Sequence, residues 1–238
     1  KDKKFGESKG LDALVGNRQL DVIIGGPPCQ AYSVAGRIRD EHGMREDYRN
    51  YLFESYLKVV QHYKPRVFVF ENVPGILSAK PGDGSVRIID LIQKAFADAG
   101  YAVLPDLSNA IIDMTEYGVP QNRKRIIILG VSKEHYGDKA EAMVEKFYSS
   151  YLPEYKIEKK ATVRDAIGDL PKLRPLDEPI SYLGRKLSHS VSDPLINGHI
   201  SRFHNKRDIE LFKFLEEDIA SGRMKYTSAK SLKTLYTK

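Results

Sequence analysis

Residues 21–30, with the sequence DVIIGGPPCQ, determine how the rest of the chain is interpreted. The short β-branched run Asp21–Gly25 predicts a strand. It leads through two prolines into Cys29, the only cysteine of the chain. Because a Pro-Pro turn is stiff, a thiol at the end of a buried strand is held still and directed outward. A single cysteine is more commonly buried and inert, but this setting favours a nucleophile.

A similar arrangement recurs at residues 66–75, where the apolar run RVFVF is followed by the turn sequence ENVPG. A strand is predicted over Val67–Phe70, and Glu71 follows it directly. A carboxylate at a buried strand end loses solvation, which raises its pKa and suits it to donate a proton. The alternative is a carboxylate that pairs with an arginine for structural reasons.

A third polar cluster, QNRKR at 121–125, opens the apolar run IIILG at 126–130. Gln121, Arg123 and Arg125 alternate, so on an extended backbone their side chains project to one face. Two guanidiniums on one face suit a phosphate or the carbonyl oxygen of a planar ring. A charged, exposed strand edge is the alternative.

Strands and helices alternate through the first 130 residues, which predicts an α/β fold with a mostly parallel, doubly wound sheet. The other predicted elements are helices over Tyr51–Tyr63 and Val86–Ala99 and strands at Tyr101–Leu104 and Arg125–Val131. Cys29 and Glu71 follow the ends of their strands, whereas Arg123 and Arg125 stand at the start of theirs. If all four share one rim of the sheet, the Arg125–Val131 strand must be the one antiparallel strand.

The character of the chain changes after Gly130. Residues 161–171 predict a short helix with Thr162 as its N-cap. Arg207–Ala220 predicts an amphipathic helix, whose apolar side is formed by Ile209, Leu211, Phe212, Leu215 and Ile219. We therefore divide the chain into an α/β domain, residues 1–160, and a following segment, residues 161–238; the resemblance described below implies that the first is a partial catalytic domain.

Composition limits the partners and cofactors. The 238 residues include 38 Lys and Arg against 32 Asp and Glu, a net charge of +6, which favours a polyanionic partner without establishing one. A single cysteine excludes an intrachain disulfide and a multi-thiolate zinc site. The histidines show no metal-ligand spacing, so no metal is predicted. With no long apolar run or signal-peptide core, we expect a soluble, cytoplasmic protein with no membrane partner.

Together, the order GGPPCQ, ENVPG and GVPQNRKR, each beside an apolar strand, resembles the cytosine-C5 DNA methyltransferases of the bacterial modification type. The resemblance spans roughly residues 18–131 and includes DYRNYLF at 47–53, which resembles the D-x-R-x-x-L-F segment of the family. It implies an incomplete Rossmann-like methyltransferase fold, S-adenosylmethionine as the methyl donor and double-stranded DNA as the partner. The target cytosine would be flipped out of the duplex, because a stacked base cannot be attacked on its face.

The resemblance also implies residue roles. Cys29 would attack C6 of the cytosine as a thiolate, and Glu71 would hold or protonate N3 and bind the exocyclic amine. Arg125 would contact O2 of the ring, with Arg123 supporting it or binding the DNA backbone. The further implied contacts are with the cofactor at Pro28 and Leu52 and with substrate or DNA at Gln30, Ser33, Asn72 and Gln121, and residues 34–46 would close over the base.

The chain departs from the family at both ends. The glycine-rich cofactor loop of the family has no match in residues 1–20, and residues 161–238 resemble only a linker and the beginning of the target-recognition region. The chain is therefore expected to be part of a larger protein, half of a split enzyme that needs a second polypeptide, or a non-catalytic DNA-binding relative. An RNA cytosine-C5 methyltransferase is a further alternative. The recognised DNA sequence does not follow from these residues.

Overall fold

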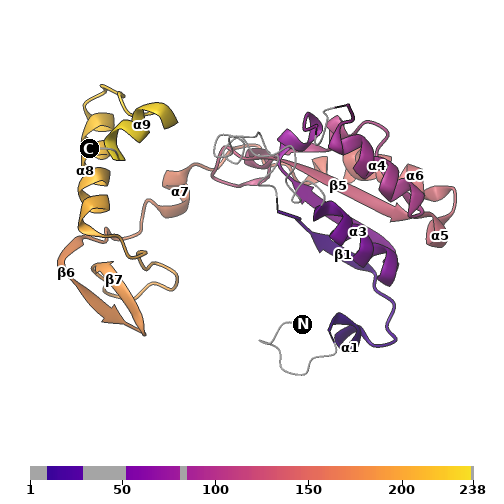
Figure 1. Ribbon diagram of the computed structural model, residues 1–238, viewed down its shortest axis with the longest axis horizontal. Coiled ribbons are helices and arrows are strands. Elements are labelled where there is room, and N and C mark those ends of the chain that lie inside the picture. Colours follow the sequence, from indigo (N-terminus) through magenta and orange to yellow (C-terminus); the bar gives the residue numbers. More distant parts are fainter. Residues whose placement is uncertain (1–9, 29–51, 81–84, 237–238) are drawn as a thin grey trace. The chain divides into compact units, whose positions relative to one another are not determined.

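A five-stranded sheet forms the centre of unit 1 (residues 1–166), the larger of two units into which the chain divides (Figure 1). This computed structural model describes residues 10–28, 52–80 and 85–236. The strands are β1 (Val22–Gly25), β2 (Val67–Asn72), β3 (Tyr101–Ala102), β4 (Ile111–Asp113) and β5 (Lys124–Ser132). The α-helices are α1 (Leu11–Val15), α3 (Leu52–Tyr63), α4 (Ile88–Asp98), α5 (Lys133–Tyr136) and α6 (Lys139–Lys146), with α7 (Val163–Ile167) at the boundary between the units. The short connecting helices are η3 (Pro74–Leu77), η4 (Leu107–Ala110), η5 (Met114–Tyr117), η6 (Phe147–Tyr151) and η7 (Pro153–Tyr155).

The topology places the ends of β1 and β2 beside the start of β5. The strand order is β1-β2-β5-β3, and β4 also pairs with β5. β1 and β2 are parallel, whereas β5 runs antiparallel to β2, β3 and β4. The prediction of a mostly parallel sheet with one antiparallel strand is confirmed. At the end of β2, Glu71 pairs with Ile127 and Asn72 with Ile126, so both residues lie beside the first residues of the antiparallel strand β5.

Strand lengths differ from those that the sequence pattern predicts. β2 is longer than the predicted Val67–Phe70, because pairing with β5 draws Glu71 and Asn72 into the ladder. The predicted strand Tyr101–Leu104 is reduced to two residues, after which the chain turns into η4. β4 was not predicted, since three residues are too few for a periodic signal. Apart from the additional strand β4, these are changes in strand ends, and the order of the predicted elements is unchanged.

Aromatic side chains fill the side of the sheet that α3 and α4 cover. Phe68 and Phe70 of β2 are fully buried and pack against Phe96 of α4 and Tyr56 of α3 in mostly edge-to-face contacts. The Tyr56 hydroxyl donates toward β1 and β2, 3.0 Å from the Val69 carbonyl, and burial raises its pKa. Gly130 is required here, because a Cβ at that position would overlap the ring of Phe68.

The opposite edge of β5 contains a gap between β3 and β4, and Tyr148 of η6 fills it. Its hydroxyl donates to the Ile127 carbonyl at 2.7 Å and accepts from the Leu129 N–H at 2.8 Å, so both backbone groups are satisfied. Burial raises the pKa of Tyr148 to about 12, and the hydroxyl stays protonated. The start of β5 is thereby fixed along both edges.

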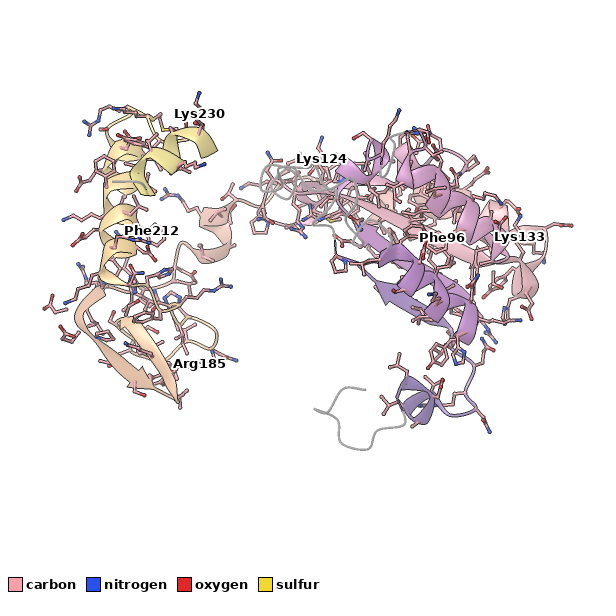
Figure 2. All side chains as sticks on the ribbon, viewed as in Figure 1. Phe96, Lys124, Lys133, Arg185, Phe212 and Lys230 are labelled. Carbon is pink, nitrogen blue, oxygen red and sulfur yellow. The ribbon has the colours of Figure 1, made fainter. Side chains whose placement is uncertain are left out.

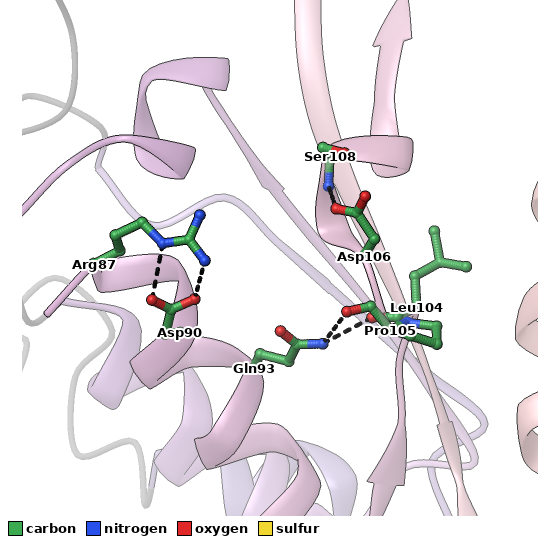
Figure 3. A network of polar contacts seen from close by, with 7 residues as sticks. All are labelled: Arg87, Asp90, Gln93, Leu104, Pro105, Asp106 and Ser108. Atoms are coloured by element: carbon green, nitrogen blue, oxygen red, sulfur yellow. Dashed lines mark hydrogen bonds and ion pairs between the residues drawn. The ribbon is translucent and has the colours of Figure 1, made fainter.

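Polar contacts join α4 to the segment that leaves β3 (Figure 3). Gln93 donates to the carbonyls of Leu104 and Pro105 at 3.0 and 2.9 Å. Asp106 then caps η4 by accepting from the Ser108 N–H at 2.9 Å. The segment that precedes β4 and β5 is therefore anchored to the helical layer.

Unit 2 (residues 167–238) is built from a hairpin and two helices: β6 (Pro175–Tyr182), β7 (Arg185–His189), α8 (Lys206–Ala220) and α9 (Ala229–Tyr236). The predicted helix is confirmed, and Asn205 caps it by accepting from the Asp208 N–H, but Phe212 and Ile219 of its predicted apolar side are exposed. The predicted Thr162 cap of α7 is also present, since its hydroxyl accepts from the Asp165 N–H. Among the described residues, no helix is both long and apolar enough to cross a lipid bilayer.

Candidate active site

A carboxylate and two guanidiniums meet where β2 ends and β5 begins. The Nε of Arg125 lies 2.8 Å from Oε1 of Glu71, and a terminal guanidinium nitrogen of Arg123 lies 3.9 Å from the same oxygen. The antiparallel register explains this contact. Glu71 pairs with Ile127, so the two side chains lie on the same face of the sheet, and Arg125, two residues before Ile127, projects to that face as well. The prediction that these side chains converge on one rim therefore holds for Glu71, Arg123 and Arg125.

Glu71 was predicted from the sequence to be desolvated, and the structure shows that it is not. Its side chain is 38% exposed, whereas that of Arg125 is 19% exposed. The carboxylate ends at the rim, so water reaches it, and Arg125 supplies the neighbouring charge. The pair is a partly exposed ion pair, which contributes about 0–1 kcal/mol to folding. Stability alone gives little reason for this arrangement.

The turn after β1 packs directly against the same carboxylate. A Cβ added to Gly26 would lie 2.7 Å from Oε2 of Glu71, so a side chain at this position would displace the carboxylate. Oε1 thus faces the arginines and Oε2 faces the turn. Cys29 follows Gly26 by three residues in the sequence. Gly26 was not predicted from the sequence as a site residue, although a pair of glycines before two prolines indicates a tight turn of the backbone.

Asn72 does not have the exposure that a predicted substrate-binding or DNA-binding residue requires. Its side chain is buried, at 1% exposure, donates to the Pro27 carbonyl at 3.2 Å and accepts from the Val73 N–H at 2.9 Å. A buried amide with both ends satisfied is a structural link. Asn72 joins the end of β2 to the turn after β1, and this contact corrects the predicted role.

Gln121 also differs from the prediction. β5 begins at Lys124, so Gln121 lies three residues before the strand and outside its regular alternation of side chains. Gln121 lies in a tight turn, where its N–H donates to the Val119 carbonyl at 2.8 Å, and its side chain is exposed. The structure does not bring it to Glu71.

Comparisons with known proteins identify the family of the chain. The model of a protein family described as C-5 cytosine-specific DNA methylase matches residues 2–233. The chain belongs to this family. It is 36% identical over 226 residues to the Type II methyltransferase M.Bpa9945I of Bacillus paralicheniformis, covering 86% of this chain and 47% of that protein. It is 33% identical over 216 residues to the Type II methyltransferase M.MthTI of Methanothermobacter thermautotrophicus, covering 90% and 58%.

A solved structure agrees in fold. A crystal structure whose name describes a DNA modification methyltransferase encoded within an E. coli prophage matches with a TM-score of 0.50 and 25% identity, covering 76% of this chain and 44% of that chain. The predicted family and Rossmann-like fold class are confirmed. The match covers 47%, 33% and 41% of the length of three such Type II methyltransferases, so the chain spans less than half of each. The comparisons give no support to a second polypeptide.

Several predicted site residues fall outside the described part of the chain. These are Cys29, Gln30 and Ser33, together with residues 34–46 and the motif residues 47–51. Their assigned roles remain predictions from the sequence.

The two residues predicted to contact S-adenosylmethionine are described, and their chemistry suits part of it. Pro28 is exposed beyond β1, and Leu52 is half-buried at the start of α3. Leu52 precedes Tyr56 by one helical turn on the same face, and Tyr56 packs over Gly25, so Leu52 lies toward the rim where β1 ends. Apolar surface of this kind fits the adenine ring. The two side chains offer no partner for the ribose hydroxyls.

A separate cavity of about 340 Å³ lies beside β4 and η5. Three of the four charged side chains that line it have partners: Glu116 pairs with Lys156 at 2.6 Å, and Asp113 accepts from the Thr115 N–H and hydroxyl. Its lining does not include Glu71 or either arginine. We therefore assign the candidate site to the rim and not to this cavity.

Proposed function

We propose that the protein is a DNA (cytosine-5-)-methyltransferase and that the rim formed by β1, β2 and β5 is its catalytic site. One observation carries the proposal within this family: the Glu71 carboxylate lies between the turn that leads to Cys29 and the guanidinium of Arg125. This is the arrangement needed to hold a pyrimidine by its polar edge while a thiolate attacks its face.

In the proposed reaction, the Cys29 thiolate forms a bond to C6 of a flipped cytosine, and the electron pair of the C5–C6 double bond moves to C5. Glu71 carries a proton on Oε2, the oxygen not engaged by Arg125, and shares it with N3, while the carboxyl group accepts a hydrogen bond from the exocyclic amine. Arg125 donates to O2 of the ring and offsets charge that develops there. Arg123, farther from Glu71, contacts the DNA backbone or supports Arg125.

When bound, S-adenosylmethionine supplies an electrophilic methyl group, and Pro28 and Leu52 would hold its apolar part. After C5 is methylated, a base removes the C5 proton and the Cys29–C6 bond breaks, which restores the double bond and the free thiolate. The rim residues thus work before and after methyl transfer, holding the ring in one orientation throughout.

The test is covalent trapping with duplex DNA that contains 5-fluorocytosine, in the presence of S-adenosylmethionine and the full-length protein. Fluorine at C5 cannot leave as a proton does, so the adduct with Cys29 should accumulate. Cys29→Ser should abolish the adduct. Glu71→Gln should slow its formation by about 10²–10⁴-fold, the usual contribution of a positioned acid or base.

The control is binding of the same duplex, which both variants should retain. An adduct that survives Cys29→Ser would refute the nucleophile. DNA binding without any adduct would support the non-catalytic alternative, and methylation of RNA in place of duplex DNA would support the RNA enzyme.

A further inference from the structure

The tip of the β6–β7 hairpin in unit 2 carries a residue that its backbone conformation does not favour. Tyr182 pairs with Arg185, so Leu183 and Gly184 form a two-residue turn. Both have positive φ, 48° for Leu183 and 72° for Gly184, as a type I′ turn requires. Glycine, asparagine and aspartate are usual at the first position, whereas leucine there costs about 1–2 kcal/mol.

Leu183 gains no packing in return. It is 78% exposed, more than any other large apolar side chain in the part of the chain that the structure describes. Met224 also combines positive φ with exposure, but its N–H donates to the Asp218 carbonyl in the turn that follows α8. Strain retained without a folding benefit is characteristic of functional sites.

Cations frame the tip on both faces of the hairpin. Arg185 stands opposite Tyr182 on one face, and Lys186 stands opposite Ser181 on the other. The ammonium of Lys186 lies 4.8 Å from the centre of the Phe203 ring. Figure 2 shows Arg185 at the end of the hairpin. An exposed apolar side chain at the tip is therefore accompanied by a cation on each face of the hairpin.

The charge of unit 2 indicates a polyanionic partner. Residues 167–238 contain 13 Lys and Arg against 9 Asp and Glu, so +4 of the net charge of +6 belongs to this unit. We propose that the hairpin tip is a DNA-binding element: Leu183 enters a groove of duplex DNA and contacts the bases, and Arg185 and Lys186 bind phosphates on either side. Proteins that insert apolar side chains into DNA combine the two kinds of contact in this way.

The inference rests on the proposed function for its choice of partner, and binding measurements with the full-length protein test it separately from catalysis. Leu183→Asn places a residue that tolerates the turn and removes the apolar contact. It should weaken binding of duplex DNA about tenfold. Because asparagine relieves the turn, the variant should fold at least as stably as the unsubstituted protein.

Leu195→Asn is the matched control. Leu195 is 53% exposed in the same unit, and no Lys or Arg adjoins it in the sequence. It should leave the affinity unchanged. Arg185→Gln should reduce the slope of log K against log salt by about 1, as loss of one phosphate contact does.

The outcomes separate the two proposals. If the unsubstituted protein is trapped by 5-fluorocytosine DNA and Leu183→Asn binds DNA as tightly as Leu195→Asn does, the hairpin inference is wrong and the proposed function stands. If Leu183→Asn weakens binding and trapping fails, the hairpin inference stands and the catalytic proposal is wrong. Failure of the unsubstituted protein to bind duplex DNA would overturn both.

Discussion

The two units of the chain are stabilised by different kinds of interaction. In unit 1, phenylalanine and isoleucine side chains of the sheet and helices are fully buried against one another. In unit 2, Leu187 is the only buried apolar side chain among the described residues, while Phe212, Phe214 and Ile219 of α8 are exposed. A rigid sheet can hold side chains at fixed separations, as the rim of unit 1 does. Unit 2 instead presents exposed side chains.

Polar contacts take over part of the stabilising role in unit 2. The buried Ser188 hydroxyl accepts from the His204 N–H at 2.9 Å and lies 3.0 Å from Nδ1 of His189. Ser190 and Arg174 exchange two hydrogen bonds across the base of the hairpin. These bonds fix the hairpin relative to the segment before α8 without an extensive apolar core. Each such hydrogen bond contributes only about 1 kcal/mol to stability, so unit 2 should unfold at a lower denaturant concentration than unit 1.

The largest expected effect comes from the core of unit 1. Phe68→Ala removes a fully buried ring and leaves a cavity next to Phe96 and Tyr101, so the free energy of unfolding should fall by about 3–5 kcal/mol. Phe212→Ala in unit 2, where the ring is 46% exposed, should cost about 1 kcal/mol or less. Urea denaturation of the two variants measures both. Equal losses would contradict the contrast between the units.

A smaller effect should distinguish the buried polar groups. Asn72→Ala and Ser188→Ala each leave buried backbone groups without a partner and should each cost about 1–3 kcal/mol. Only Asn72 supports the turn beside Glu71. Asn72→Ala should therefore lower kcat with little change in DNA affinity, whereas Ser188→Ala should leave kcat unchanged. Steady-state kinetics, with DNA binding measured in parallel, give the comparison. A loss of kcat in both variants would show that Asn72 has no specific role in supporting catalysis.

The smallest expected effect is a dependence on pH. The hydroxyl and N–H of Thr115 donate to the Asp113 carboxylate and lower its pKa. A lowered pKa in the folded state adds stability above the unfolded value, about 3.9, and this stability is lost as the pH falls through the folded value. Asp113→Asn keeps an acceptor but cannot titrate. Between pH 7 and pH 3, the free energy of unfolding of the Asp113→Asn variant should therefore fall by less than that of the unsubstituted protein.

The matched change for this prediction is Asp177→Asn on the exposed strand β6 of unit 2. Urea denaturation at both pH values decides the matter, and an equal effect of the two substitutions would mean that the Asp113 cap contributes nothing.

Local sequence was sufficient for the order of the strands and main helices of unit 1 except β4, and for the reversal of β5. Runs such as Ile126–Leu129 and the spacing of Phe53, Tyr56 and Val60 indicate strand and helix because periodicity depends on neighbours in the chain. The three polar clusters were also visible, since each directly adjoins an apolar run. Their motifs were sufficient to indicate the family.

Only the tertiary structure decided how those residues are used. Pairing of β2 with β5 put Glu71 beside Arg125, buried Asn72 and left Gln121 in a turn. The close approach of Gly26 to Glu71 and the exposure of Leu183 also depend on residues far apart in the sequence or on a turn conformation. The physical reason is that hydrophobic periodicity records which face of an element is apolar, whereas register, burial and the partner of each charge are set by contacts between elements.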